Sequence, residues 1–379
     1  MIKRAIDGFL AKRMFGGKVI VVYGPRQSGK TTAIEHYLSQ NAREHEVVKF
    51  DGDEASDREI LADASVERVR TLIGNKRIIF IDEAQKIPEI GFVLKRMYDH
   101  LKDVQVIATG SSSEDLAEKT EEPLTGRKFE WTMLPLSFAE LANESSPIEE
   151  MRQLESRLMF GSYPDVVTHP GDEVERIREI GKGYLYKDIL KHESIRRPEL
   201  VDKILRALAF QIGQEVSFNE VAQTCGTDPK TVAKYIDILT KAFIVFPLSS
   251  YARNLRNELK KTVKIYFWDL GIRNYVIGDW RPIASRSDDE KGHMFEDYFV
   301  AERAKWRLIH EADARAFFWR TTSSPKEVDL VEESGGTLRA LEVKWNEKRT
   351  AKLPPTFAAA YPNAEFGKVS HTNYNDWLN

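Results

Sequence analysis

The sequence predicts an α/β protein of several domains, and three observations support this fold class. A short apolar run, KVIVVY (18–23), leads into the glycine-rich stretch GPRQSGKTT (24–32) and then into a helical pattern. A second apolar run, RIIFIDEAQ (77–85), ends in two acids. Near the far end, KEVDLVEESGG (326–336) and TLRALEVKW (337–345) form a predicted hairpin. A chain of 379 residues is too long for one core, so we expect roughly two to four domains.

The composition is that of an ordinary soluble protein, with 42% hydrophobic and 30% charged residues. The formal net charge of −3 excludes a chain-wide basic field, so a nucleic acid would need a local patch. The N-terminus lacks a signal-peptide pattern, and no apolar run approaches the roughly 20 residues of a membrane span. The single cysteine, Cys225, excludes an intrachain disulfide. We therefore expect a cytoplasmic protein without a membrane partner.

The glycine-rich stretch has the spacing GxxxxGKT between a strand and a helix, which is typical of a phosphate-binding loop. Gly24 and Gly29 let the backbone curl, so that its N–H groups face phosphates. Lys30 can reach the β- and γ-phosphates, and Thr31 can offer a hydroxyl to Mg²⁺. The alternative is a glycine turn without a ligand. The predicted nucleotide-binding residues are Gly24, Pro25, Arg26, Gln27, Ser28, Gly29, Lys30, Thr31 and Thr32.

The next two predicted strands end in polar residues that suit phosphoryl transfer. Asp82 is predicted to hold Mg²⁺, and Glu83 to orient or deprotonate the attacking water. The alternative is a pair of acids at a solvated strand end. After the strand in DVQVIATGSSS (103–113), Ser111 or else Thr109 is predicted to contact the γ-phosphate or the water. A serine that caps a helix is the competing interpretation there.

An arginine is a further candidate for this chemistry. Arg127, in LTGRKFEW, could neutralise charge on the transferred phosphoryl group, and Arg26 inside the loop could serve the same end. If Arg127 came from a neighbouring copy, the protein would have to be a homo-oligomer. The alternative is a solvated arginine with no such role.

These motifs, in this order, resemble the prokaryotic AAA-type ATPases of the archaeal-ATPase and STAND branch. The resemblance is carried by GPRQSGKTT, FIDEAQ, TGSSS, the GR at 126–127 and LPLSFAE, with GSYPDVV (161–167) and YLYKDILK (184–191) further along. It implies ATP as the nucleotide, whereas the residues alone do not separate ATP from GTP. It also implies a C-terminal domain of unknown function with a winged helix and a restriction-endonuclease-like part.

The middle of the chain is predicted to hold a helical lid over the nucleotide (149–205), followed by a winged helix (206–282). Within the latter, residues 217–248 form a serine-capped helix, a short turn and a second helix, as in a helix-turn-helix. Strands on either side of a basic run would form the wing, and this run could contact DNA phosphates. A packing or protein-interaction module is the alternative. The cations of the run are Arg253, Arg256, Lys260, Lys261 and Lys264.

The last domain (283–379) resembles the PD-(D/E)xK nucleases in the order of its charged residues. Glu296 lies on a predicted helix and Asp329 on the first strand of the hairpin. Glu342 and Lys344 lie two positions apart on the second strand, and therefore on one face. Asp329 and Glu342 would hold Mg²⁺ or Mn²⁺, and Glu296 would be a further ligand or hold the water. Lys344 would orient that water or stabilise the pentacovalent phosphate. The alternative is an exposed same-face ion pair on an edge strand.

The predicted architecture is a P-loop NTPase domain (1–148), a helical lid (149–205), a winged helix (206–282) and a restriction-endonuclease-like α/β domain (283–379). The leading hypothesis is an ATPase coupled to a DNA-directed, metal-dependent nuclease-like domain. The alternative is a STAND-like, ATP-driven switch whose winged helix and last domain bind a partner without cutting it.

Overall fold

The chain divides into two units in this computed structural model. The first comprises residues 3–134 together with 241–243, and the second comprises residues 135–240 and 244–379. None of the described helices combines the length and the apolar character that a membrane span needs. The structure describes residues 1–62, 65–111, 116, 118–184, 195, 197–251, 263–321 and 326–378.

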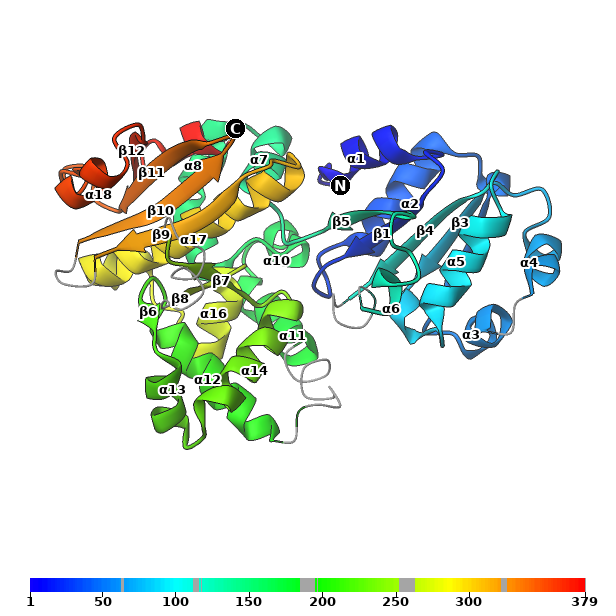
Figure 1. The fold of residues 1–379 in the computed structure, drawn as a ribbon, viewed down its shortest axis with the longest axis horizontal. Helices are drawn as coiled ribbons and strands as arrows, with labels where there is room; N and C mark the ends of the chain where they lie inside the picture. Colours follow the sequence, from blue (N-terminus) through cyan, green and yellow to red (C-terminus); the bar gives the residue numbers. More distant parts are fainter. Residues whose placement is uncertain are drawn as a thin grey trace. The chain divides into compact units, whose positions relative to one another are not determined.

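A five-stranded parallel sheet forms the centre of the first unit (Figure 1). Its strands are β1 (Val19–Tyr23), β2 (Val47–Asp51), β3 (Ile78–Asp82), β4 (Gln105–Gly110) and β5 (Lys128–Thr132). Their order is β2-β3-β4-β1-β5, so β4 separates the strand before the glycine-rich loop from the strand that ends in the acids. The three predicted strands in this region are confirmed. Because all five strands run in one direction, their carboxyl ends meet at one edge of the sheet.

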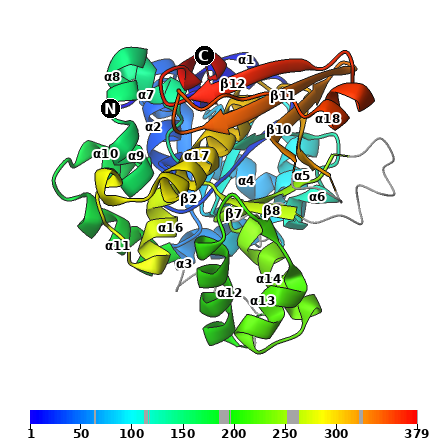
Figure 2. The same cartoon turned by 90° about the vertical axis from the view of Figure 1, so that its left-hand side faces the viewer.

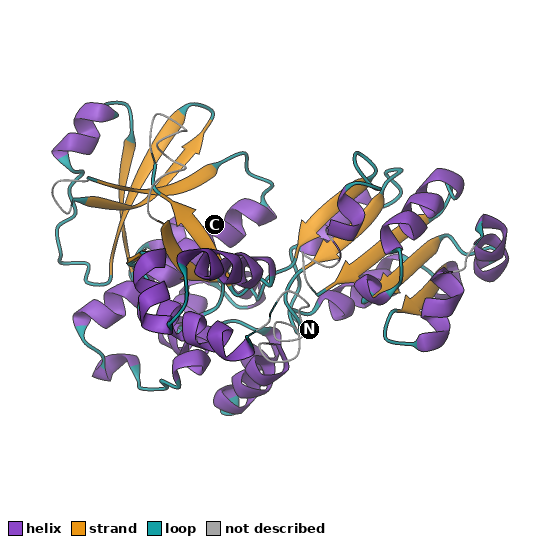
Figure 3. Cartoon of the chain, turned by 60° about the horizontal axis from the view of Figure 1, so that its bottom comes forward, coloured by secondary structure: helices purple, strands orange, loops and turns teal. Residues whose placement is uncertain are grey.

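Helices cover both faces of this sheet, as the unbroken apolar strands require (Figure 3). Val19, Val21 and Tyr23 belong to the core cluster that also contains side chains of α3, α4 and α5. Ile20 and Val22 alternate with them and point to the other face, on which Figure 1 shows α1 and α2. The helices are α1 (Ile6–Arg13), α2 (Lys30–Asn41), α3 (Ala55–Ala62), α4 (Val66–Ile73), α5 (Ile90–His100) and α6 (Glu118–Glu121).

The second unit begins with short helices that are tied to its later residues by buried polar contacts. Asp269 accepts a hydrogen bond from Ser162 N (2.7 Å), and Glu302 accepts one from Phe138 N (2.6 Å). The helices predicted as a lid therefore belong to the same unit as the C-terminal residues. The predicted lid (149–205) covers α9 (Leu154–Phe160), α10 (Pro164–Thr168), α11 (Glu173–Tyr184) and parts of α8 (Pro147–Arg152) and α12 (Pro198–Phe210). The preceding helix, α7 (Phe138–Glu144), lies in the stretch that was predicted as part of the P-loop domain, but it belongs to the second unit.

A pair of helices and a small antiparallel sheet follow. The first helix begins after Ser217, whose hydroxyl accepts from Glu220 N, and it ends at Gly226, which has a φ of 69°. The sheet has the order β6-β8-β7, and the predicted strands on both sides of the basic run are present. Residues 252–262, which contain most of that run, lie outside the described residues. The elements are β6 (Glu215–Val216), α13 (Phe218–Cys225), α14 (Pro229–Lys241), β7 (Val245–Ser249), β8 (Val263–Phe267) and α16 (Leu270–Ile277).

A four-stranded sheet with a long helix completes the second unit (Figure 2). The strands β9, β10 and β11 are antiparallel, and β12 pairs in parallel with β11. The predicted hairpin turns at Gly335 and Gly336, which both have positive φ. Because β11 lies between β10 and β12, it is not an edge strand. The elements are α17 (Asp288–Ile309), β9 (Arg315–Arg320), β10 (Glu327–Ser334), β11 (Thr337–Lys344), α18 (Pro355–Ala360) and β12 (Glu365–Ser370).

Candidate nucleotide site and carboxylate–lysine site

The glycine-rich loop connects β1 to α2 in the way that a phosphate-binding loop requires. Gly24 has a φ of 150°, and a Cβ at this position would lie 2.0 Å from the carbonyl oxygen of Met133. Gly29, with a φ of 88°, precedes the first turn of α2. Lys30 Nζ donates to the carbonyl oxygens of Gly24 (2.9 Å) and Pro25 (2.8 Å). The ammonium therefore lies inside the loop, where the phosphates of a nucleotide would be held.

The two residues predicted to hold Mg²⁺ lie next to each other. Thr31 Oγ1 donates to Asp82 Oδ2 at 2.8 Å, which joins the start of α2 to the end of β3. Thr109, on β4, donates to the other oxygen of Asp82. A buried carboxylate beside two hydroxyls suits a hard cation that prefers oxygen ligands. Thr109 thus contacts the acid that is predicted to hold Mg²⁺, and it belongs to this group together with Thr31.

Glu83 is held by a residue that the sequence analysis missed. Glu83 has a positive φ of 45°, and Gln85 Nε2 donates to its Oε2 at 2.6 Å. The same Nε2 donates to Ser111 Oγ at 3.0 Å. Gln85 therefore links the acid after β3 to the serine after β4. Its position two residues after Glu83 was the available sequence signal.

The remaining loop residues also fit a phosphate-bearing ligand. Ser28 is fully buried, and its hydroxyl has no hydrogen-bond partner among the described residues. Gln27 has a φ of 59°, so the backbone turns left-handed beside it. Pro25 and Arg26 complete the loop, and Thr32 lies in the first turn of α2. The structure thus brings all nine predicted nucleotide-binding residues into one loop and helix start.

Arg127 lies at the other edge of the sheet. Its carbonyl accepts a hydrogen bond from the N–H of Val19, the first residue of β1, whereas the loop follows the last residue of that strand. Five residues of strand separate the two edges by about 16 Å. The side chain lies over the ring of Tyr98 and 3.9 Å from Asp99. Arg127 therefore does not reach the nucleotide loop of its own chain. The remaining prediction is that Arg127 of one copy contacts the nucleotide of a second copy.

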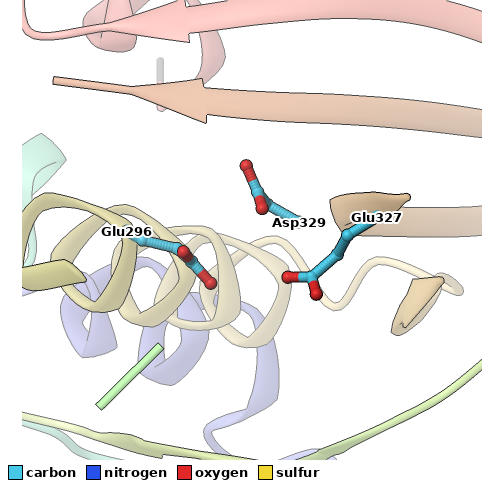
Figure 4. A group of neighbouring side chains, drawn as sticks. All are labelled: Glu296, Glu327 and Asp329. Carbon is cyan, nitrogen blue, oxygen red and sulfur yellow. The ribbon is translucent and has the colours of Figure 1, made fainter. Parts of the chain in front are cut away.

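The second site is a group of carboxylates between α17 and β10 (Figure 4). Glu296, Glu327 and Asp329 each offer an oxygen, and these oxygens lie within 4.8 Å of one another. Glu327 was not predicted, although it lies two residues before Asp329 and thus on the same side of the strand. Three convergent carboxylates are a donor set that fits Mg²⁺ or Mn²⁺.

The pair that ends β11 joins this group. Lys344 Nζ lies 2.7 Å from Glu342 Oε1 and 3.5 Å from Asp329 Oδ2. The second oxygen of Glu342 is buried and has no hydrogen-bond partner among the described residues. The two acids therefore approach closely enough to share one cation. Since β11 is an inner strand, the exposed edge pair that was the alternative interpretation is not what forms here.

The location of the Lys264 side chain contradicts the sequence analysis. It was expected on an exposed basic wing, but it is 0% exposed on β8. Its Nζ lies 2.9 Å from Glu296 Oε1 and also contacts Glu327. Tyr266, two residues along β8, donates to the same Glu296 oxygen at 2.7 Å. The prediction that Lys264 contacts phosphate from the wing is therefore wrong, because this lysine neutralises the carboxylate group.

Burial and neighbouring charges shift the ionisation of these groups. Burial raises the pKa of Glu296, and the charge of Asp329 adds to the rise while Lys264 opposes it. Burial and then Asp329 raise the pKa of Glu342 in the same way. Burial alone would lower the pKa of Lys344, but Asp329 and Glu342 outweigh it and raise that pKa. The pKa of each glutamate is thus shifted towards neutral pH, the range in which a carboxyl group can both take up and release a proton.

A cavity of about 630 Å³ opens onto Glu296, Glu327 and Asp329. The cavity is lined by residues of the turn before α13 and by residues of α17, β10 and β11. The predicted winged helix and the last domain therefore both contribute to it. Acids predominate in its lining. The acids are Glu215, Glu220, Asp288, Asp289, Glu296, Glu327 and Asp329, and the lysine and arginines are Arg320, Lys344 and Arg349.

Comparison with family models assigns the chain in three consecutive parts. A AAA domain matches residues 16–142. A domain of unknown function, DUF8612, matches residues 151–281, and a second one, DUF4143, matches residues 291–375. The carboxylates thus lie in the third part, whereas Lys264 lies in the second.

Relatives span most of the chain. An uncharacterized protein of Mycobacterium tuberculosis is 28% identical over 339 residues, which are 88% of this chain and 72% of the relative. One of Methanocaldococcus jannaschii is 22% identical over 320 residues, or 79% of this chain and 69% of the relative. Among solved structures, a Walker-type ATPase of Pyrococcus abyssi superposes with a TM-score of 0.51 at 16% identity, covering 73% of this chain and 96% of that one. Together with the family match, this likeness shows that the chain contains an AAA-type ATPase domain.

Proposed function

We propose that this chain hydrolyses ATP in its first unit and that hydrolysis controls a metal-dependent, DNA-directed nuclease site in its second unit. The observation that carries the nuclease part is the convergence of Glu296, Glu327 and Asp329, with Lys344 between Asp329 and Glu342. Glu342, which was predicted as a metal ligand, lies outside the group of three carboxylates and contacts Lys344 instead. These residues come from α17, β10 and β11 within the order helix, three antiparallel strands, helix and parallel strand. This arrangement supports the predicted restriction-endonuclease-like domain.

In the ATPase site, the residues divide the work as follows. Lys30 binds the β- and γ-phosphates, and Thr31 and Asp82 would hold Mg²⁺, which when bound would neutralise charge on the phosphates. Glu83 orients the attacking water and accepts its proton. Gln85 and Ser111 are positioning residues, because their hydrogen bonds fix the carboxylate of Glu83.

In the nuclease-like site, Glu296, Glu327 and Asp329 would hold Mg²⁺ or Mn²⁺, which lowers the pKa of water and offsets charge on phosphate. Val343 N donates to Asp329 Oδ2 at 2.8 Å, so β11 orients the acid of β10. Lys344 stabilises negative charge that develops on the phosphate. Glu342 holds Lys344 in place through its 2.7 Å contact.

The helix pair α13 and α14, together with β7 and β8, is proposed to act as the winged helix. The second helix exposes Lys230 and Lys234, which lie one turn apart and suit phosphate contacts. This is a feature of the described residues and does not depend on the basic run at 253–261. It supports DNA as the partner.

The alternative function is a STAND-like switch that binds a partner without cutting it. The specific observation in its favour is the charge of the cavity, where seven acids face three lysine and arginine side chains. Such a lining repels a polyanion until cations are bound. Lys264 and Lys344 already neutralise part of the carboxylate group.

The deciding experiment measures cutting of several DNA forms with Mg²⁺ or Mn²⁺, with and without ATP. We expect Asp329→Asn to abolish cutting and leave ATP hydrolysis unchanged, and Lys30→Ala to abolish hydrolysis and alter cutting. Asp313→Asn is the matched control, because this aspartate is exposed and lies outside the carboxylate group. Hydrolysis of ATP without any cutting, in the wild type and under every metal condition, would reject the nuclease in favour of the switch.

A further inference from the structure

The ammonium of Lys264 is a cation built into the carboxylate group. It is fully buried, and it contacts two of the three acids whose oxygens converge, Glu296 and Glu327. A buried ammonium is tolerated where carboxylates neutralise it. Lys264 does not line the cavity, although both of its partners do. A metal ion that enters through the cavity therefore meets carboxylates that are already engaged from the protein side.

We propose that Lys264 competes with a divalent metal ion for Glu296 and Glu327, so that the site binds metal strongly when this lysine is withdrawn. The inference rests on the proposed function of the site and adds its regulation. An ammonium and a metal ion bind the same carboxylate oxygens, and two cations a few ångströms apart repel each other. Lys264 thus holds the site in a state with low affinity for metal.

The position of Lys264 on β8 provides a way to control this competition. Lys264 and Tyr266 both lie on β8, and both contact Glu296 Oε1. The strand β8 pairs with β6 and β7, whereas the acids lie on α17 and β10. A shift of β8 relative to α17 would remove both donors from the glutamate together.

The other lysine of the site differs in this respect. Lys344 lies on β11, which pairs directly with β10 in the same sheet and carries its partner Glu342 two residues away. It therefore moves with the carboxylates and stays beside them. The contact of Lys264 with the carboxylates instead depends on the packing of β8 against α17, where Phe267 N also donates to Asp297 Oδ1 at 3.0 Å. The strand β8 belongs to the proposed DNA-binding winged helix.

The test is a titration of the nucleotide-free full chain with Mn²⁺, in which free Mn²⁺ is measured by its electron paramagnetic resonance signal. We expect Lys264→Met to bind Mn²⁺ at least tenfold more tightly than the wild type. Lys264→Arg keeps the charge and should remain weak. Lys291→Met removes a lysine of α17 that lies outside the cavity, and its affinity should match the wild type.

A second set of variants separates competition from loss of structure. Lys264→Gln keeps a hydrogen-bond donor without the charge, and it should also bind Mn²⁺ more tightly, even where Lys264→Met fails to fold. Adding Glu327→Gln to either variant should cancel the gain. Mn²⁺ should also raise the melting temperature of these variants more than that of the wild type.

Two other results would overturn the inference, and they are distinguishable. If Lys264→Met and Lys264→Gln fold and bind Mn²⁺ no more tightly than the wild type, Lys264 is a structural residue and competition is rejected, while the metal site stands. If neither the wild type nor any variant binds Mn²⁺ although all of them hydrolyse ATP, the metal site itself is absent. The proposed nuclease then fails together with this inference.

Discussion

Gln85 holds the acid that we propose as the general base of ATP hydrolysis. Its Nε2 donates to both Glu83 and Ser111, so it fixes the acid relative to the end of β4. We expect Gln85→Ala to lower kcat for ATP hydrolysis by about 100-fold, within the range for a misplaced general base, while KM stays within about twofold. Steady-state kinetics check this. Gln40→Ala, an exposed glutamine of α2, should change neither constant, and a rise in KM at constant kcat would contradict a positioning role.

The residues of a site could be predicted from the sequence where their spacing along the chain defines the site. The loop from Gly24 to Thr32 and the pair Glu342–Lys344 follow from neighbours in the sequence, and the structure brings each set together. Lys264 could not be predicted, because its partners lie 32 and 63 positions away. A lysine within a basic run resembles a surface residue until the fold shows which side of its strand is buried.

At the scale of elements, α17 is the helix that organises the second unit. It begins with a capping box formed by Ser287 and Glu290, which defines its start from local sequence alone. Glu296 lies in its third turn, and Arg303 lies two turns later and binds Glu332 of β10 through two nitrogens, at 3.1 and 2.7 Å. The helix therefore carries one acid of the candidate site and is fixed to the strand that carries the others.

The pH dependence of stability should report this attachment. Burial alone would raise the pKa of Glu332, but Arg303 and Arg307 outweigh it and lower that pKa. A lowered folded-state pKa means that the stabilisation is present above the ordinary value of about 4.3 and is lost as the pH falls below it. We expect Glu332→Gln to cost about 3 kcal/mol at pH 7, because it leaves two buried guanidinium groups without their carboxylate.

Urea unfolding at several pH values between 7 and 3.5 measures this effect. The difference between the wild type and Glu332→Gln should shrink towards the acidic end. Glu333→Gln is the matched control, since the neighbouring glutamate pairs with the exposed Arg315 and should cost less than about 1 kcal/mol. A cost for Glu332→Gln that is equal at every pH would mean that packing, and not charge, accounts for it.

At the scale of the whole molecule, the order of the strands in the sheet determines which predicted site residues lie together. The sequence predicted β1, β3 and β4 but neither β2 nor β5, and no local pattern states that β5 pairs with β1 in parallel. That pairing puts Arg127 at the amino edge of the sheet and the nucleotide loop at the carboxyl edge, so the two lie apart although β5 and β1 are neighbours. Long-range pairing is a property of the packed sheet, which local patterns do not encode.

Arg4 offers a route by which the nucleotide loop could act on the second unit. Its guanidinium donates to the carbonyl oxygen of Ser28 in the loop (2.6 Å) and to that of Leu134 (2.8 Å), the last residue of that stretch of the first unit. Two residues later, the carbonyl of Leu136 accepts from Lys305 of α17 at 3.2 Å. We therefore expect a change in the loop on ATP binding to shift residues 134–136, which Lys305 of α17 contacts.

Hydrogen exchange with and without ATP tests this route. In the wild type we expect ATP to change exchange in α7 and α17, and in Arg4→Ala this change should fall by at least half while ATP affinity stays within about threefold, since the lysine and hydroxyls that bind phosphate are intact. Lys3→Ala alters an exposed neighbour and should behave as the wild type. An undiminished ATP-dependent change in Arg4→Ala would show that the signal travels by other contacts. A diminished change together with unaltered hydrolysis would separate coupling from chemistry, because Arg4 touches the loop through a backbone carbonyl and not through a group that binds phosphate.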